Sequence, residues 1–286
     1  MIRHHELSDV EWEFVRPLLP ESLRDRKRLD DRTILDGIVW TFRAGVAWRD
    51  VPERYGSWAM LHTRFRRWVK DGTFTRMLQA AQARADAADD IDWLVSVDST
   101  IVRAHQHAAG ARKGGVGPLG RSRGGLTSKI RLACDAFGRP LALVVTGGGN
   151  TNDCTRFTTV MEAIRVPRIC PGRPRTRPFH VIGDKGYSSK EIRTWLRRRG
   201  IAHTIPERAD QVRNRLRRGS RGGRPPAFDQ QIYKRRNVVE RCFNRLKQWR
   251  GIVTRYEKTA ESYQAAVTLA SLMMWADVGV TFDDRT

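Results

Sequence analysis

Apolar positions recur at helical spacing through the first 90 residues. Residues 8–11 (SDVE) have the form of a capping box, which starts a helix. The stretches 30–45 and 57–72 place apolar side chains three or four positions apart and end near glycines. Residues 77–89 are alanine-rich and predict a further helix or a linker. This pattern predicts a small all-α domain over residues 1–90.

The pattern changes after residue 90. Alternating apolar and polar positions predict a strand leading into Asp98, then a hairpin over 126–148, with short strands before Asp184 and at 201–206. Helices are expected between and after these strands, including an apolar one at 261–280 that closes the core. The order predicts an α/β domain over residues 91–286, a mixed sheet flanked by helices. A basic, Gly/Pro-rich loop is expected at about 207–228.

The net charge is the strongest indication of the kind of partner that the protein binds. Lys and Arg number 53 against 31 acidic residues, a net charge of +22, and such a surface favours a polyanionic partner, most often nucleic acid. Residues 1–90 hold 16 cations and 15 acids, whereas residues 191–258 hold 20 and 6, a net +14. The excess therefore lies in the second predicted domain. The first is helix-turn-helix-like and is predicted to bind DNA, but its near-neutral charge leaves a plain helical bundle open as the alternative.

Other classes of protein and site are disfavoured. The four cysteines, Cys134, Cys154, Cys170 and Cys242, form no C-x-x-C pair, so a zinc site of that type is not expected. Scattered thiols suit a reducing, cytoplasmic setting. The N-terminus has no apolar signal-peptide core, and no stretch of about 18 apolar residues predicts a membrane span.

Two aspartates follow predicted strands and are the first candidates for chemistry. Asp98 closes LVSVD and Asp184 closes FHVIGD. Carboxylates at the carboxyl ends of strands lie where loops open onto a cleft. Taken singly, each has a simpler interpretation as a turn residue or a helix cap, because Asp is common in turns.

The stretch 233–247 predicts a basic helix with a single carboxylate, Glu240. At 100° per residue, Tyr233, Arg236, Glu240 and Lys247 share an arc of about 60°, beside an apolar stripe. The stripe predicts packing against the core, and the adjoining polar row is expected to face a cleft. An i,i+4 ion pair between Arg236 and Glu240 is the simpler interpretation, but it leaves the aligned Tyr and Lys unexplained.

Three carboxylates in a basic surround suit divalent metal ions acting on phosphodiesters. Hard oxygen ligands favour Mg²⁺ or Mn²⁺. Two such ions about 4 Å apart can activate an attacking oxygen and stabilise a leaving one. The residue pattern alone thus supports a metal-dependent, nuclease-like site.

The same residues carry a family resemblance. VDST at 97–100, VIGDKGYSS at 181–189 and the Y-x2-R-x3-E-x6-K series resemble the Asp-Asp-Glu (DDE) transposases of insertion sequences, in the IS4/IS5 group. Residues 35–72 resemble the N-terminal helical region of the IS5 family. The resemblance covers nearly the whole chain and implies an RNase H-like catalytic domain.

The resemblance also implies roles for individual residues. Asp98, Asp184 and Glu240 would form the catalytic, metal-binding triad, with two Mg²⁺ or Mn²⁺ ions. A metal-activated water would nick the transposon end, and the freed 3′-hydroxyl would attack target DNA. The residues expected to contact DNA phosphates are Tyr233, Arg236 and Lys247, with Lys185 and Tyr187 as possible helpers.

The implied partner is double-stranded DNA, as terminal repeats and as target, bound by a homodimer. Two other functions stay open at this point. One is a metal-dependent DNA nuclease that cuts without joining. The other is a non-catalytic DNA-binding regulator, which an intact set of three carboxylates argues against.

Overall fold

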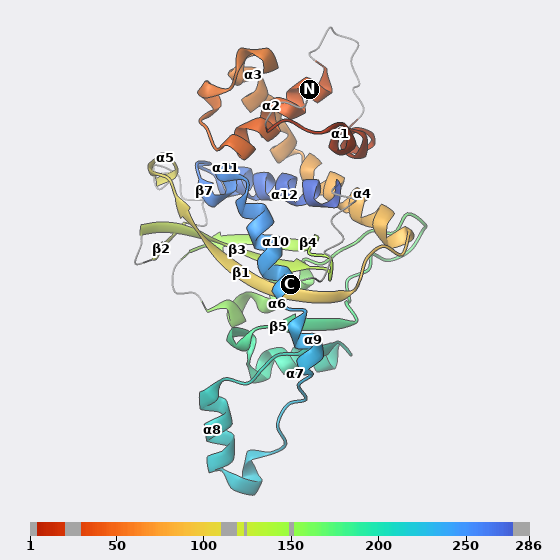
Figure 1. Cartoon of the computed structure of the whole chain (residues 1–286), viewed down its shortest axis with the longest axis vertical. Coiled ribbons are helices and arrows are strands. Elements are labelled where there is room, and N and C mark those ends of the chain that lie inside the picture. The colour runs from red at the N-terminus through yellow and green to blue at the C-terminus, as the bar shows by residue number, and fades with distance from the viewer. Residues whose placement is uncertain (1–4, 21–29, 110–118, 123–124, 149–151, 277–286) are drawn as a thin grey trace.

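A computed structural model describes residues 5–20, 30–109, 119–122, 125–148 and 152–276. The N-terminal part is helical, as predicted, and stands at the top of Figure 1. Its elements are α1 (Asp9–Val15), η1 (Arg16–Leu18), α2 (Asp31–Ala44), η2 (Trp48–Asp50), η3 (Glu53–Tyr55), α3 (Trp58–Lys70) and α4 (Thr73–Ala87). The predicted capping box forms, because Ser8 accepts from the Glu11 amide and Glu11 reaches back to the Ser8 amide.

A mixed sheet forms the centre of the molecule. Its strands are β1 (Leu94–Ala104), β2 (Gly120–Ser122), β3 (Gly125–Cys134), β4 (Pro140–Gly147), β5 (His180–Gly183), β6 (Ala202–Thr204) and β7 (Thr254–Arg255). β3 runs antiparallel to both β1 and β4, whereas β5 is parallel to β1 and β6 to β5. The resulting order, β4-β3-β1-β5-β6 with only β3 reversed, is that of an RNase H-like fold, which confirms the predicted fold class.

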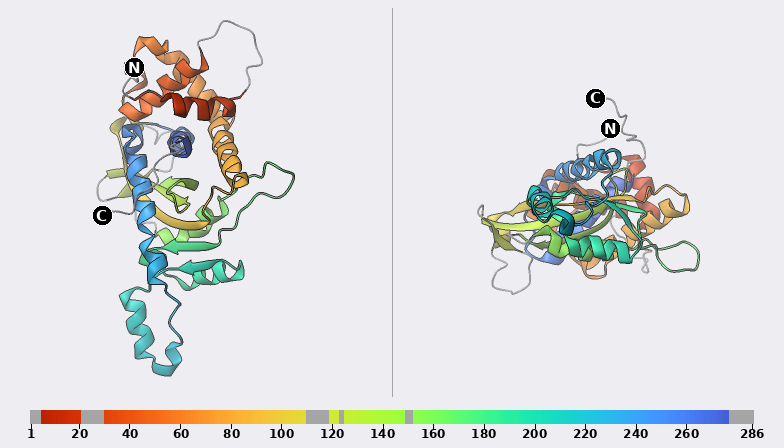
Figure 2. Two further views of the ribbon diagram at one scale, coloured as in Figure 1. Left: turned by 45° about the vertical axis from the view of Figure 1, so that its right-hand side comes forward. Right: turned by 90° about the horizontal axis from the view of Figure 1, so that it is seen from below.

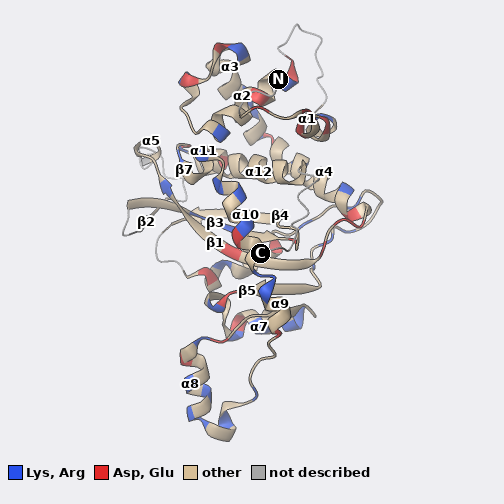
Figure 3. Ribbon diagram, viewed as in Figure 1, with Lys and Arg blue, Asp and Glu red and all other residues tan. Residues whose placement is uncertain are grey.

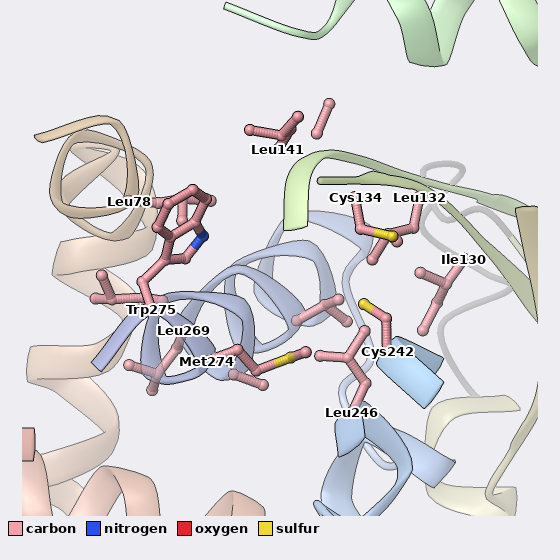
Figure 4. Close-up of a cluster of buried hydrophobic side chains, with 14 of the residues drawn as sticks. Leu78, Ile130, Leu132, Cys134, Leu141, Cys242, Leu246, Leu269, Met274 and Trp275 are labelled. Carbon is pink, nitrogen blue, oxygen red and sulfur yellow. The ribbon is translucent and has the colours of Figure 1, made fainter. Parts of the chain in front are cut away.

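Helices surround this sheet, some packed on its faces and one in an arm that projects away from it. They are α5 (Gln106–Ala109), α6 (Phe157–Glu162), α7 (Lys190–Arg198), α8 (Ala209–Arg217), α9 (Gln230–Lys234), α10 (Asn237–Lys247), α11 (Arg250–Val253) and α12 (Ala260–Ala276). Alternate residues of β3, among them Ile130, Leu132 and Cys134, face Cys242 of α10 and Met274 of α12 in Figure 4. The intervening residues of β3 face the side of α6, because side chains alternate along a strand.

The core continues from the sheet into the N-terminal helices. α12 is almost wholly buried and packs against α4, α3 and α1 as well as β4. The carbonyl of Pro140 in β4 accepts from Gln82 of α4 at 3.1 Å and from the Trp275 indole of α12 at 3.0 Å. The predicted domain boundary at residue 90 falls between α4 and β1, and the division into two domains stays a prediction.

The predicted single helix over 233–247 is wrong at its start. α9 and α10 are separate, with a turn at Arg235 and Arg236. The amides of Val238 and Val239 bond to carbonyls three residues back, at 3.2 and 3.1 Å, rather than four. This tighter turn changes the helical register, so a continuous wheel does not apply to Tyr233.

The predicted basic loop at about 207–228 contains structure as well. α8 is a two-turn helix, followed by η7 (Gly219–Gly222). Arg, Gln, Leu and Asn are compatible with a helix, and the breaking Gly and Pro residues come only after position 218. Gln211 anchors the start of α8, since its amide donates to the Ser188 carbonyl at 2.7 Å.

Within the described residues, no helix combines the length and apolar character needed to cross a lipid bilayer.

Leu246 tests how much the packing of α10 contributes to stability. Its side chain is 1% exposed and lies near α12, whereas Leu216 of α8 is 68% exposed. We expect Leu246→Ala to lower the free energy of unfolding by about 2–5 kcal/mol through loss of buried contacts. Leu216→Ala should change it by less than about 0.5 kcal/mol. Urea unfolding followed by circular dichroism measures both, and equal effects would contradict the packing described.

Candidate active site

The pairing of β1 with β5 brings the two predicted aspartates together. Val97 pairs with Gly183, the last residue of β5, in parallel register. Asp98 and Asp184 are the next residues of each chain segment, so they are neighbours across the two strands. Residues paired in this way point to the same face of a sheet. That face is the one α10 covers.

Asp98 does not close its strand, contrary to the sequence-based prediction. β1 runs six residues further, to Ala104, because β3 continues to pair with it as far as Arg103. The β-branched residues Thr100, Ile101 and Val102 favour this extension. It is β5 that ends, and its end leaves Asp98 beside the loop that carries Asp184.

Backbone amides fix both carboxylates locally. Asp98 Oδ1 accepts from the Ser99 amide at 2.8 Å, and Asp184 Oδ1 accepts from the Gly186 amide at 2.8 Å. The second bond makes Asp184 the N-cap of η6 (Lys185–Tyr187). Its simpler interpretation as a helix cap is therefore correct, and the cap also orients this carboxylate.

The surroundings of Asp98 perturb its carboxyl group. Burial raises the pKa of Asp98 above its ordinary value, and the Ser99 amide opposes that rise. The negative charge of Asp184 raises the pKa further, while Arg236 lowers it. A carboxylate held in such surroundings gains from any nearby cation.

Arg236 links the third carboxylate to the first. Its Nη1 lies 3.3 Å from Asp98 Oδ2, and its Nη2 bonds to Glu240 Oε1. Burial alone would lower the pKa of Arg236, but Glu240 and Asp98 raise it overall. The i,i+4 ion pair expected as the simpler interpretation thus exists, and the same guanidinium also reaches across to β1.

The three carboxylates have the ligand chemistry that a divalent cation needs, but their arrangement does not yet form a metal-binding cluster. Asp98, Asp184 and Glu240 offer only hard carboxylate oxygens, which suit Mg²⁺ or Mn²⁺. Among the described residues, however, no group of three or more His, Cys, Asp or Glu side chains is arranged to hold a metal ion. The positive charge between Asp98 and Glu240 is that of Arg236.

The residues expected to contact DNA differ in their accessibility. Lys185 and Lys247 are exposed, and Tyr233 is half-buried with its ring 5.2 Å from that of Phe228. Tyr187 is 2% exposed and packs against Phe157, so in this structure it has no surface to offer DNA. Its burial follows from the η6 turn, which directs the ring into the core.

A cluster on the opposite face of β3 was not predicted. Lys129 Nζ lies 2.8 Å from Asp153, and Arg131 Nε lies 3.3 Å from it. Lys129 and Arg131 are 8% and 1% exposed. The sequence signal is two cations, two positions apart, on either side of Ile130 in a strand, which places both on one face.

This cluster connects to the loop that holds Asp184. Cys154 follows Asp153 in η5 (Asp153–Arg156), and its thiol donates to the Gly186 carbonyl at 2.7 Å. The Gly186 amide is the group that donates to Asp184. The cluster therefore braces, through η5, the turn that orients this carboxylate.

Comparison with known proteins identifies the family. A family model described as "Transposase DDE domain" matches residues 90–275, and one described as "Putative transposase of IS4/5 family" matches residues 7–78. This chain belongs to the IS4/IS5 family of DDE transposases.

Two of three curated relatives of this transposase are named as transposases. It is 36% identical over 167 residues to the "Putative transposase for insertion sequence element IS402" of Burkholderia cepacia, covering 58% of this chain and 70% of that one. It is 29% identical over 150 residues to the "Putative transposase for insertion sequence element IS6501" of Brucella ovis, covering 52% and 98%. "Uncharacterized protein y4sN" of Sinorhizobium fredii is 40% identical over 122 residues, covering 42% and 94%.

Among solved structures, the transposase is similar to a chain of the "Mos1 transposase paired-end complex with left transposon end". The TM-score is 0.27 at 12% identity, over 89% of this chain and 80% of that one. Similarity at this level adds nothing to the fold assignment, which follows from the strand order.

Asp153 tests the cluster behind the sheet. Asp153→Asn removes the one negative charge that is paired with two buried cations, and we expect the free energy of unfolding to fall by about 3 kcal/mol. Asp210→Asn is the matched control, because the 54% exposed Asp210 side chain pairs with Arg208 at the surface and such pairs contribute about 0–1 kcal/mol. Chemical denaturation compares them, and an unchanged Asp153→Asn would contradict the bracing role.

Proposed function

We propose that this transposase cuts DNA at the ends of an insertion sequence and joins the freed strand to target DNA, with Asp98, Asp184 and Glu240 as its catalytic carboxylates. The observation that carries the proposal is the neighbouring pair of aspartates, linked through Arg236 to Glu240. Family membership supplies the reaction class.

Asp98, Asp184 and Glu240 would hold Mg²⁺ or Mn²⁺. Bound divalent cations supply Lewis acidity to the attacking and leaving oxygens of a phosphodiester. Asp98 and Asp184 are already oriented by backbone amides, so Glu240 is the carboxylate that must turn. Its side chain is 50% exposed, which gives it that freedom.

Arg236 would change partners when DNA binds. In the structure its guanidinium is divided between Asp98 and Glu240. A phosphate diester offers two oxygens that match a guanidinium bidentately. Arg236 would then hold the phosphate, releasing Asp98 and Glu240 for their catalytic role.

Exposed cations beside the carboxylates would hold the DNA backbone. Lys185 directly follows Asp184, and Lys247 ends α10, about 10 Å along the helix from Glu240. On α3, Arg66 and Arg67 are exposed and offer a contact for the N-terminal helices, as a helix-turn-helix-like role requires. Pairing of two insertion-sequence ends favours a homodimer on DNA.

The α8 arm, formed by α8 and η7, offers a second basic surface. It projects from the body at the bottom of Figure 1, and Figure 3 shows basic residues recurring along it. Its exposed arginines are Arg213, Arg217, Arg218 and Arg221. An extended basic arm can follow a DNA backbone beyond the active site.

Glu240→Gln tests the catalytic assignment. The amide keeps the size of the side chain and loses its charge, so we expect cleavage to fall at least about 100-fold while DNA affinity stays within about twofold. Glu261→Gln, an exposed substitution at the start of α12, is the matched control. The assay uses labelled insertion-sequence ends with Mg²⁺, and undiminished cleavage by Glu240→Gln would reject the triad.

The same assay separates the three candidate functions of the wild-type protein. Joined products support the transposase, cut ends alone support a nuclease, and shifted but intact DNA supports a non-catalytic binding protein.

The α8 arm is tested through the salt dependence of DNA binding. Replacing both Arg217 and Arg218 by Ala should weaken binding to all duplexes and lower the slope of log K against log salt by about 2, one for each lost phosphate contact. The double variant of exposed Arg168 and Arg173, between α6 and β5, is the control. Equal slopes for the α8 variant and wild type would exclude the arm from the DNA interface.

A further inference from the structure

A cavity of about 590 Å³ lies between the N-terminal helices and the segment that follows β7. In both Figure 1 and Figure 2, α11 and β7 lie next to the N-terminal helical layer. Cavities of roughly 300–1,000 Å³ are the size at which proteins bind small organic groups. Its aromatic lining comes from Phe42, Trp48, Trp58, His62, His107 and Tyr256.

The aromatic walls are held in place before any ligand binds. Trp48 donates from its indole nitrogen to Glu257 at 3.0 Å, and its ring lies 5.7 Å from Phe42 and 5.3 Å from Phe65. Trp58, in the first turn of α3, is 39% exposed. One indole is therefore fixed in the cavity wall, and a second is partly exposed to solvent.

The charges around the cavity favour an anion. Arg49, Arg66 and Lys258 line it against a single carboxylate, Glu257. Arg49 lies over Trp58, with its guanidinium carbon 5.5 Å from the ring centroid. Burial, together with Arg66, lowers the pKa of His62, so this imidazole is a neutral flat surface at pH 7. Flat aromatic faces beside cations suit a nucleotide, whose base stacks while its phosphate pairs.

The position of the cavity relative to the carboxylates suggests where this nucleotide comes from. Ala104, at the end of β1, pairs with Arg255, which directly precedes Tyr256 and Glu257. The six residues from Asp98 to Ala104 span about 20 Å. That distance corresponds to about six base-pair steps of 3.4 Å.

We propose that this aromatic–basic pocket receives one unstacked nucleobase of the DNA bound at the carboxylates, with the flanking phosphates on Arg49, Arg66 and Lys258. The inference rests on the proposed function, because the DNA must occupy the active site for the pocket to meet it. The pocket would hold the duplex at a second position, in addition to the carboxylates. An anchor of this kind sets the register of the scissile phosphate over the carboxylates.

The test is photo-crosslinking of wild-type protein to duplexes of the insertion sequence's own end. Each duplex carries a single 5-iododeoxyuridine at one of positions 1–12 from the scissile phosphate. We expect a maximum at about positions 4–8, mapped by mass spectrometry to Trp48, Trp58 or Tyr256. Trp58→Ala should abolish the Trp58 adduct and weaken DNA binding about 10-fold, as loss of one stacked base does.

Two variants keep the result interpretable. Trp58→Phe retains a ring and should restore most of the affinity if stacking is the cause. Phe179→Ala is the control, because Phe179 is 72% exposed and lies outside the pocket. If Trp58→Ala does not fold, the crosslink map of the wild-type protein decides alone.

The outcomes separate this inference from the proposed function. Wild-type protein that binds and cleaves the duplexes but crosslinks only outside the pocket overturns the inference and leaves the proposed function standing. Wild-type protein that neither binds nor cleaves the duplexes overturns both. If free deoxynucleoside monophosphate shields Trp58 from chemical oxidation and no duplex crosslinks there, the pocket binds small molecules instead, and the inference fails.

Discussion

The carboxylates of Asp98 and Asp184 are neighbours on β1 and at the end of β5, where their like charges repel. Partial burial strengthens that repulsion, because little water screens it. The structure offsets it with Arg236, whose guanidinium also bonds Glu240. Positive charge is thus required at this point of the sheet before any ligand arrives. A site in need of cations, on a chain with net charge +22, is suited to a polyanion that brings divalent ions with it.

On the opposite face of the sheet, cations are likewise paired with a carboxylate, but there the cations are buried. Lys129 and Arg131 are buried and share Asp153, whose single negative charge compensates one of their two positive charges within the protein. Cys154, the residue after Asp153, donates a hydrogen bond to the Gly186 carbonyl, and the Gly186 amide donates to Asp184 and orients it. One carboxylate of the site is therefore braced from behind the sheet. Glu240, half-exposed on α10, is free to reorient, and a site that binds and releases metal and DNA needs one such movable ligand.

Much of this arrangement could be predicted from the sequence, because period-two and period-3.6 patterns report local burial. These patterns correctly predicted the N-terminal helices, the β3–β4 hairpin and the helix that carries Glu240. The sequence-based predictions are wrong where contacts between distant parts of the chain determine where an element begins or ends. β1 extends past Asp98 because β3 pairs with it, and the turn at Arg235 and Arg236 interrupts a sequence that is helical in pattern. Tyr187 is buried because of a three-residue turn that no periodicity shows.

The extension of β1 also links the parts of the molecule that the local patterns treat separately. From Asp98 the strand continues to Ala104, which pairs with Arg255, and the next residues, Tyr256 and Glu257, line the aromatic cavity. The indole of Trp48, in the N-terminal layer, bonds to Glu257. Continuous pairing with β3, joined by pairing with β7 at Arg103 and Ala104, thus fixes the distance between the carboxylates and the cavity. Such a fixed spacing is what a duplex with a regular rise requires of a protein that must cut it at one phosphate.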